Sequence, residues 1–156
     1  MRSAIIKLRL MATLRDTPYR TVRFLVDLVT GENHPFFEVT LPDHIVEPIE
    51  YRDGNDRTPG AHKVPGPVGV TNLILKRYFR GSLELYAWVR QLQDDPSQGR
   101  RNITVQLLSE NGVDVVAAWH LRNAWPTRHS FSPLNAVYCD VLIEEIEIVC
   151  ESVELE

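Results

Sequence analysis

The chain has 156 residues, enough for one domain with a substantial hydrophobic core. Apolar residues make up 44% of it and charged residues 24%, an ordinary globular balance, and no apolar run approaches the roughly 20 residues that a membrane-spanning helix needs. The net charge of −4 gives no general reason to expect nucleic acid as a partner.

The amino-terminal residues look like a signal peptide only superficially. Lys7 and Arg9 interrupt their apolar stretch, and a small-residue cleavage site is missing. The two cysteines, Cys139 and Cys150, do not make a disulfide framework. We therefore expect synthesis in a reducing cytoplasm.

The first part of the chain predicts strands. Residues 20–28 alternate apolar and polar side chains, which predicts a strand with one buried face. Residues 36–41 predict a second, short strand, and residues 44–51 continue in extended form. Pro48 removes a donor from the ladder, so this stretch is expected to be an edge strand or a projecting arm. The apolar side chains of the first buried face are Val22, Phe24, Val26 and Leu28.

A long loop is predicted next. Residues 52–69 hold four of the eight glycines and three of the ten prolines. A loop of this length in a compact domain is usually functional, disordered or ordered only by a partner. Residues 70–79 then predict a strand.

One helix is predicted, over residues 83–93. Ser82 is the expected N-cap, and Glu84 lies in the first turn, where a carboxylate suits the helix dipole. The spacing i, i+3, i+4, i+7 places one apolar stripe on the helix, made of Leu85, Trp88, Val89 and Leu92.

Three more strands complete the predicted fold. Residues 102–109 and 113–122 are expected to form a hairpin. Trp125 and Pro126 follow, and since proline stops ladder pairing and tryptophan buries a large area, we expect them to end the strand at a fixed angle. The closing strand, 136–152, places Ile146, Ile148 and Cys150 on one face and Glu145, Glu147 and Glu151 on the other.

No catalytic, cofactor-binding or metal site is visible. None of the five histidines pairs with another at a metal-ligand spacing, and neither cysteine has a CxxC partner. Glu144, Glu145 and Glu147 could suggest metal-binding carboxylates, but in a strand Glu145 and Glu147 share one face and Glu144 takes the opposite one. We therefore interpret this acidic run as a solvated or interface face and expect no enzyme.

Charge is distributed unevenly along the chain. Residues 140–156 hold seven acidic residues and no Lys or Arg, whereas residues 52–101 carry nine Lys and Arg. The two regions either neutralise one another within one fold or associate head to tail, the acidic face of one copy meeting the basic face of the next.

Seven short stretches stand out by their order and spacing. They are IEYRDGND at 49–56, NLILKR at 72–77, LYAWV at 85–89, RRN at 100–102, NAWP at 123–126, LNA at 134–136 and VLIEEIEIVCE at 141–151. Together they resemble tail tube proteins of contractile injection systems, a family that includes contractile-phage tail tubes and, closest to this chain, the inner tubes of extracellular phage-tail-like particles. The resemblance covers about residues 16–152, which sets a tail-tube-like β domain at 16–156 after an N-terminal extension at 1–15. Met1 and Met11 both stay open as the start.

The resemblance implies a mainly β fold of two packed antiparallel sheets, a sandwich or barrel with one helix. It further implies that six copies close a ring and that rings stack into a conduit for cargo and envelope puncture. The implied partners are copies of the chain, the sheath, baseplate and spike proteins, a tube terminator or cap, and cargo in the lumen. No cofactor and no nucleic-acid binding by the monomer are implied.

Contacts between copies are expected at positions within these stretches. The candidates are Glu50, Tyr51, Arg52, Asp53, Lys76, Arg77, Arg100, Arg101, Trp125, Pro126, Asn135, Glu145 and Glu147.

Two alternatives stay open. The chain departs from the usual family pattern at residues 40–44, 129–131 and 150–152, which leaves a tube-initiating ring protein at the baseplate as an alternative to the bulk subunit. An alternative of another class is a monomeric β-barrel that binds a small molecule in a pocket lined by Trp88, Trp119 and Trp125.

Overall fold

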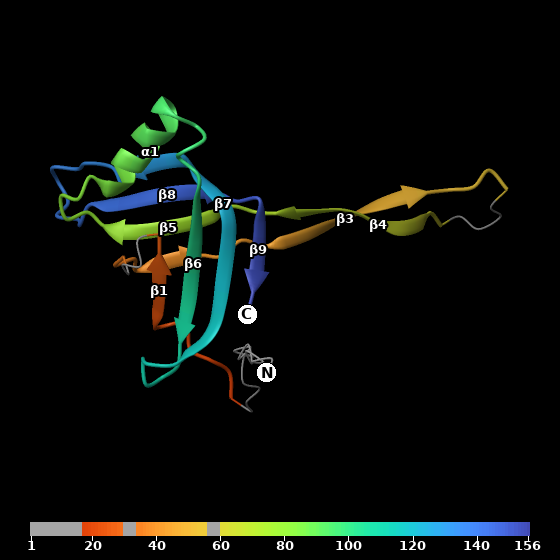
Figure 1. Ribbon diagram of the computed structural model, residues 1–156, viewed down its shortest axis with the longest axis horizontal. Helices are drawn as coiled ribbons and strands as arrows, with labels where there is room; N and C mark the ends of the chain where they lie inside the picture. Colours follow the sequence, from red (N-terminus) through yellow and green to blue (C-terminus); the bar gives the residue numbers. More distant parts are fainter. Residues whose placement is uncertain (1–16, 30–33, 56–59) are drawn as a thin grey trace, which may run out of the picture.

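The computed structural model of the chain describes residues 17–29, 34–55 and 60–156. Within these ranges the chain forms nine strands and one helix, and a long two-stranded ribbon leaves the main body at one side (Figure 1). The predicted extension, residues 1–15, lies outside the described residues.

The main body is one seven-stranded antiparallel sheet that folds over on itself. Its strand order is β1-β6-β7-β8-β5-β2, and β9 also pairs with β7. The strands are β1 (Phe24–Asp27), β2 (Glu38–Thr40), β5 (Leu73–Tyr78), β6 (Arg101–Leu108), β7 (Val115–Phe131), β8 (Ile143–Val149) and β9 (Ser152–Leu155).

The long strand β7 belongs to both halves of this sheet. Its first part pairs with β6 and β9, and its second part pairs with β8. Asn123 has a positive φ of 49°, and the register shifts between Pro126 and Arg128. This bend carries the chain from one packed layer to the other, as strands that switch sheets do. The predicted fold class, two packed antiparallel sheets with one helix, is confirmed, with β7 shared by the two layers.

The prediction that Trp125 and Pro126 end a strand is wrong. Trp125 pairs with Val149 and Pro126 with Ile148, and β7 continues to Phe131. The missing amide hydrogen of Pro126 is tolerated because the register shift follows directly after it.

Apolar side chains between the two layers form the core. Each fully buried Leu or Ile contributes about 1.5–3 kcal/mol to folding. The prediction for the first strand was too long, since β1 spans only Phe24–Asp27 and Val22 is exposed. The core residues with no more than 2% exposure include Val26, Leu28, Leu73, Leu75, Leu85, Trp88, Ile103, Leu121, Ile146 and Ile148.

The ribbon is the hairpin of β3 (His44–Tyr51) and β4 (His62–Val70), which we call the arm. The prediction of a projecting arm is confirmed, but the prediction of a loop over 52–69 is wrong for its second half. Pro48 and Pro65 face each other next to a register shift, where an edge strand can spare the ladder donors. Gly66 is required there, because a Cβ would lie 2.4 Å from the carbonyl oxygen of Glu47.

The helix α1 (Glu84–Asp94) packs against β7. Leu85 and Trp88 are buried, as the predicted stripe requires, and the Trp88 indole donates to the carbonyl oxygen of Gly99 at 2.7 Å. The helix begins after Leu83 without a side-chain cap, so the expected capping role of Ser82 was wrong.

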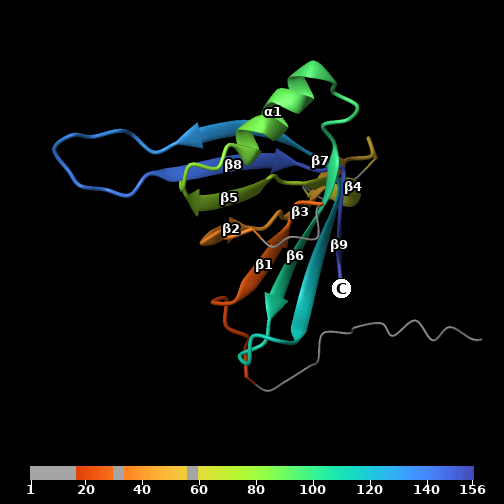
Figure 2. The same ribbon diagram turned by 60° about the vertical axis from the view of Figure 1, so that its left-hand side comes forward.

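The closing strand starts later than predicted. β8 begins at Ile143, and residues 132–142 form a loop that projects from the end of the sheet (Figure 2). After a break at Cys150 and Glu151 the chain continues as β9, which pairs with the first part of β7. We call residues 132–142 the end loop.

Candidate assembly surfaces

The arm exposes apolar side chains without packing them on the rest of the domain. All eight residues of β3 are exposed. An isolated two-stranded hairpin is marginally stable in water, so this ribbon is suited to being completed by a partner. The exposed apolar residues of the arm are Ile45, Val46, Ile49, Tyr51, Val64 and Val68.

Four of the predicted interface residues lie toward the outer part of the arm. The Glu50 carboxylate lies 3.1 Å from the Lys63 ammonium, and the Tyr51 ring stacks on His62 at 5.4 Å. Arg52 and Asp53 follow β3 and are exposed. All four are therefore available to a neighbouring molecule.

Trp125 and Pro126 face opposite sides of the sheet. Pro126 is buried, whereas Trp125 is half-buried on the outer side, with the Arg100 guanidinium 4.8 Å from the centre of its ring. Arg100 also pairs with Glu151 at 2.5 Å. The pKa of Glu151 lies below its ordinary value, chiefly because the Asn123 side chain donates a hydrogen bond to the carboxylate. The hydrogen bond and positive charge of Arg100 lower this pKa further.

Arg101 is held against the helix. Its guanidinium lies 4.7 Å from the centre of the Trp88 ring, and it donates to Gln91 at 3.2 Å. Burial lowers the pKa of Arg101, because a desolvated guanidinium ion is less favourable. Arg101 therefore connects the start of β6 to α1.

The outer face of the second layer carries a row of paired charges. The Lys76 ammonium lies 2.7 Å from Glu38 and 3.9 Å from Glu145, and Glu145 lies 3.7 Å from Arg128. The hydrogen bond to Glu38 is the main reason why the pKa of Lys76 is raised. Glu147 accepts from Asn72 at 2.6 Å. The structure thus brings Lys76 and Glu145 together on a half-exposed face.

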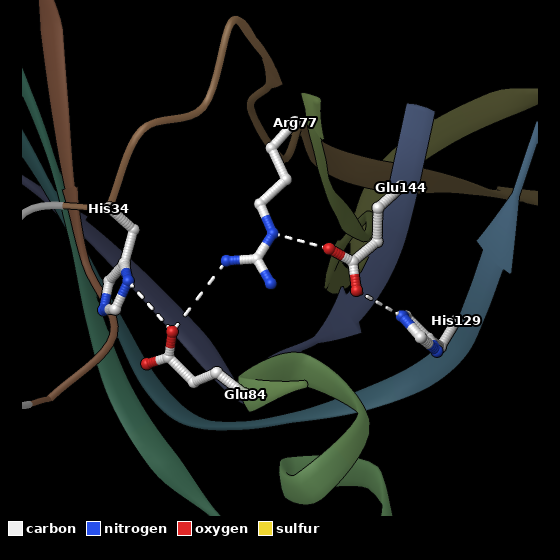
Figure 3. Close-up of polar contacts among 5 residues, drawn as sticks. All are labelled: His34, Arg77, Glu84, His129 and Glu144. Atoms are coloured by element: carbon white, nitrogen blue, oxygen red, sulfur yellow. Dashed lines mark hydrogen bonds and ion pairs between the residues drawn. The ribbon is translucent and has the colours of Figure 1, made fainter. Parts of the chain in front are cut away.

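Arg77 lies on the inner face and is only 5% exposed. Its Nε donates to the Glu144 carboxylate at 2.6 Å, and Nη1 lies 3.8 Å from Glu84 (Figure 3). His129 Nε2 lies 2.8 Å from Glu144, and His34 Nδ1 lies 3.3 Å from Glu84. Any effect of Arg77 on assembly would therefore pass through these contacts inside the subunit.

The inner cluster was not predicted, and the interpretation of the acidic run as a solvated or interface face is wrong for Glu144, which is only 1% exposed. The sequence nevertheless carried one signal for the cluster. Period-two alternation places Glu144 on the apolar face of its strand, and a buried carboxylate requires a cation. The register of β5 and β8 places Arg77 directly opposite Glu144. Nothing in the sequence indicated the contributions of His34, Glu84 and His129.

The uneven charge distribution is neutralised at three places within the fold. The basic middle of the chain meets its acidic end in the pairs Lys76–Glu145, Arg77–Glu144 and Arg100–Glu151. These pairs support the first of the two interpretations of that distribution, and head-to-tail association stays a prediction.

The end loop is ordered by its own hydrogen bonds. The Asn135 side-chain oxygen accepts from the amides of Val137, at 2.8 Å, and Tyr138, at 3.4 Å. At the base of the loop, the Ser132 amide donates to the Ile143 carbonyl oxygen at 2.9 Å. Asn135 therefore shapes the loop, whose exposed apolar residues are Leu134, Val137, Tyr138 and Val141.

The three tryptophans do not line one pocket. Trp88 lies on the buried side of α1, Trp125 lies under Arg100, and Trp119 lines a hollow of about 280 Å³ beside Phe24 and Val39. The structure therefore contradicts the pocket on which the small-molecule alternative depended. Among the described residues, no group of three or more His, Cys, Asp or Glu is placed to hold a metal ion. In the same part of the chain, no helix has the length and apolar character to cross a membrane.

Comparisons with known proteins agree with this geometry. Residues 20–154 match the family model of the T4-like virus tail tube protein gp19. A comparison with curated proteins found no match.

The solved structures that share the fold include three that match over at least 90% of this chain. A chain of the PVC sheath–tube complex, from an extracellular contractile injection system in the extended state, is 29% identical, with a TM-score of 0.79 over 90% of this chain and 93% of that chain. A chain of the anti-feeding prophage tube-terminating cap is 26% identical, with a TM-score of 0.79 over 97% and 99%. A chain of the anti-feeding prophage baseplate is 22% identical, with a TM-score of 0.80 over 91% and 97%, a likeness that shows the fold alone.

Proposed function

The chain belongs to the family of the T4-like virus tail tube protein gp19, and from that premise we propose that it is the bulk subunit of the inner tube of an extracellular contractile injection system. It is a tail tube-like structural protein and a component of a phage tail-like particle or virion. In the proposed assembly six copies close a ring, and stacked rings form a conduit that carries cargo and punctures an envelope.

The arm is the observation that carries this proposal. It is a 17-residue pair of strands with apolar side chains exposed along its length, and no strand in the described part of the chain pairs with either outer edge. A ligand-binding monomer has no use for such a ribbon, because its exposed apolar side chains and unpaired edges favour association with other molecules. In a ring with a repeating axial contact, the same ribbon is completed by another copy.

The partners of the tube follow from the same proposal. The structure of the PVC neighbour contains a sheath together with a tube, which supports a sheath around this chain. A terminator or cap, a baseplate with its spike, and cargo within the lumen are the other proposed partners. We propose no catalytic role and no cofactor.

A second position in the particle is favoured by one observation. The match with a chain from the anti-feeding prophage cap spans 97% of this chain and 99% of that chain. The match with the sheath–tube neighbour spans slightly less, 90% and 93%. A specialised ring at an end of the tube, whether cap or baseplate initiator, is therefore the second candidate.

Two measurements test these candidates. Negative-stain microscopy and sedimentation of the purified chain at micromolar concentration should show rings or stacked rings, and a stable monomer under all conditions would contradict the proposal. Counting copies per isolated particle then separates the positions. A bulk subunit is present in many rings, whereas an initiator or cap contributes one ring only.

A further inference from the structure

Three neighbouring strands of the folded sheet are interrupted at the same level. In β7, Asn123 takes a positive φ of 49°, a conformation that asparagine tolerates better than most residues. Beside it, the pairing of β6 with β7 shifts register at Asn102. On the other side, Cys150 and Glu151 separate β8 from β9. We call these four residues the crease, and they lie where β7 curves from one layer into the other (Figure 1).

The backbone ladders also change partners at the crease. The pairing of β6 with β7 ends at Arg101 and Ala124. The pairing of β7 with β8 starts one residue later, at Trp125 and Val149. Of the described strands, β7 is therefore the one that continues through the crease. Two of the buried side chains at this level, those of Ala124 and Cys150, are small, so a change of angle here disturbs few core contacts.

Side chains on the exposed surface bridge the crease. The Asn123 amide donates to Asn102 Oδ1 at 3.1 Å, and Asn123 Nδ2 donates to Glu151 Oε2 at 2.7 Å. The other carboxylate oxygen, Glu151 Oε1, accepts from Arg100 Nη1 at 2.5 Å. The Arg100 guanidinium in turn lies 4.8 Å from the centre of the Trp125 ring. We call Arg100, Asn102, Asn123 and Glu151 the clasp, and Glu151 is at its centre because both of its oxygens have partners.

The clasp lies in solvent, whereas each layer is held by its own ladders and by the core. The side chains of Arg100 and Glu151 are 46% and 48% exposed. Exposed hydrogen bonds and ion pairs are individually weak, so the clasp can open while both layers stay folded. A few residues at the ends of elements, set between two rigid parts, are what a hinge requires.

From this arrangement we propose that the crease is a hinge between the two layers and that the clasp fixes its angle. Asn123 is the positioning residue, because its backbone makes the bend and its side chain holds Glu151. When the clasp opens, the layers rotate about the backbone of residues 123–125 while the ladders of each layer persist. The subunit can then change the angle between its layers without unfolding.

Distances between spin labels on the two layers measure this angle. Val113→Cys, in the turn between β6 and β7, and Phe131→Cys, at the end of β7, place exposed labels on either side of the crease. A second pair, Val113→Cys with Leu155→Cys in β9, lies within the first layer. Cys139→Ser removes the exposed native thiol, whereas Cys150 is buried. Labelled chain is diluted into unlabelled chain, and double electron–electron resonance gives the distance distribution within one subunit.

Loss of the clasp should act on the label pair across the crease alone. We expect Glu151→Ala and Asn123→Gly to broaden or shift that distribution by more than its wild-type width. Glu151→Gln keeps an oxygen for Asn123 but loses the ion pair with Arg100, so its change should be smaller. Glu154→Ala is the matched control, because it removes an exposed ion pair, with Arg122 at 3.3 Å, that lies within the first layer. It should leave both distributions as in the wild type.

Two results would overturn the proposal. Unchanged distributions in folded Glu151→Ala and Asn123→Gly, as verified by circular dichroism, would show that the core alone sets the angle. Equal broadening of both label pairs would show that the whole subunit is loosened and that the crease is no hinge. If Glu151→Ala does not fold, Glu151→Gln and Asn123→Gly provide the same test. The hinge belongs to the single subunit, so these outcomes do not depend on whether the wild type forms rings.

Discussion

The folded sheet and the arm place polar and apolar groups in opposite ways. In the sheet, a salt bridge between Arg77 and Glu144 is buried in the interior, where the two opposite charges pair with each other. In the arm, Ile49 and Val64 lie opposite each other in solvent, with no third layer to cover them. The sheet therefore pairs these buried charges within one subunit, whereas the arm leaves its apolar side chains uncovered.

This difference assigns stability and assembly to separate regions. Substitutions inside the sheet should change the free energy of unfolding of the subunit. Substitutions in the arm should leave that free energy nearly unchanged and alter the association of copies, since the arm packs on little within its own chain. The predictions below test how sharply the two regions divide these roles.

The largest effect is expected from removing one charge of the buried pair. Glu144→Ala leaves the Arg77 guanidinium in the interior without its partner, which costs about 3–5 kcal/mol of unfolding free energy. Urea denaturation measures this cost. Glu145→Ala is the matched control on the outer face of the same strand and should cost at most about 1 kcal/mol, as half-exposed ion pairs do. Equal losses in the two variants would show that the inner cluster is solvated.

The two tryptophans whose rings are contacted by arginines, Trp88 and Trp125, provide a second comparison. Trp88, on the buried side of α1, is almost completely buried, so Trp88→Ala should cost about 3–5 kcal/mol. Trp125 is only half-buried, and Trp125→Ala should cost about 1–3 kcal/mol, part of it from the lost contact with Arg100. Thermal and urea unfolding of the two variants measures the difference. A larger loss of unfolding free energy in Trp125→Ala than in Trp88→Ala would show that Trp125 contributes more to the core than its half-buried position indicates.

A glycine pair tests whether the arm is independent of the sheet. Gly66→Ala places a methyl group 2.4 Å from the Glu47 carbonyl oxygen, which must distort the arm, whereas at Gly69 the nearest atom is 3.9 Å away. We expect Gly66→Ala to speed amide exchange throughout the arm while changing global stability by less than about 1 kcal/mol. Gly69→Ala should leave exchange as in the wild type. Faster exchange across β5 and β8 in Gly66→Ala would show that the two regions are coupled.

The same contrast explains how far the sequence could be followed. Alternation located β5 and β6, and helical spacing located Leu85 and Trp88, because each pattern depends only on neighbours along the chain. The second strand of the arm was missed because its glycines and prolines indicate a loop one by one. These residues fit a ribbon because Pro65 pairs with Pro48 in the other strand. Rules that consider only neighbours along the chain cannot predict which residues pair across two strands.

The inner cluster and the bend in β7 were beyond prediction for related reasons. The burial of Glu144 follows from its parity in the strand, but its pairing with Arg77 depends on which strand lies beside it. The bend at Asn123 and the register shift after Pro126 allow β7 to belong to both layers. Proline usually ends a strand, but Pro126 only interrupts the hydrogen-bond ladder, and the strand continues. Interface roles for the exposed candidates stay predictions until copies are seen together.

The smallest expected effect concerns pH and the outer surface beside Trp125. The hydrogen bond from Asn123 and the ion pair with Arg100 hold the pKa of Glu151 below the ordinary value of 4.5. A carboxyl group with a lowered folded-state pKa stabilises the fold above its unfolded pKa, and this contribution is lost as pH falls through the folded pKa. Glu151→Gln should therefore flatten the acid limb of the stability curve below about pH 4.5 and leave the alkaline limb unchanged.

Lys76 supplies the control of opposite sign. Its pKa is raised above 10.5, chiefly by the hydrogen bond with Glu38, so its contribution is present below the unfolded pKa and is lost as pH rises through the folded pKa. Lys76→Met should change only the alkaline limb of urea unfolding measured against pH. If Glu151→Gln left the acid limb as steep as in the wild type, the surface contacts of Arg100 would contribute nothing to the folded sheet, and their place beside Trp125 would have to be explained by assembly alone.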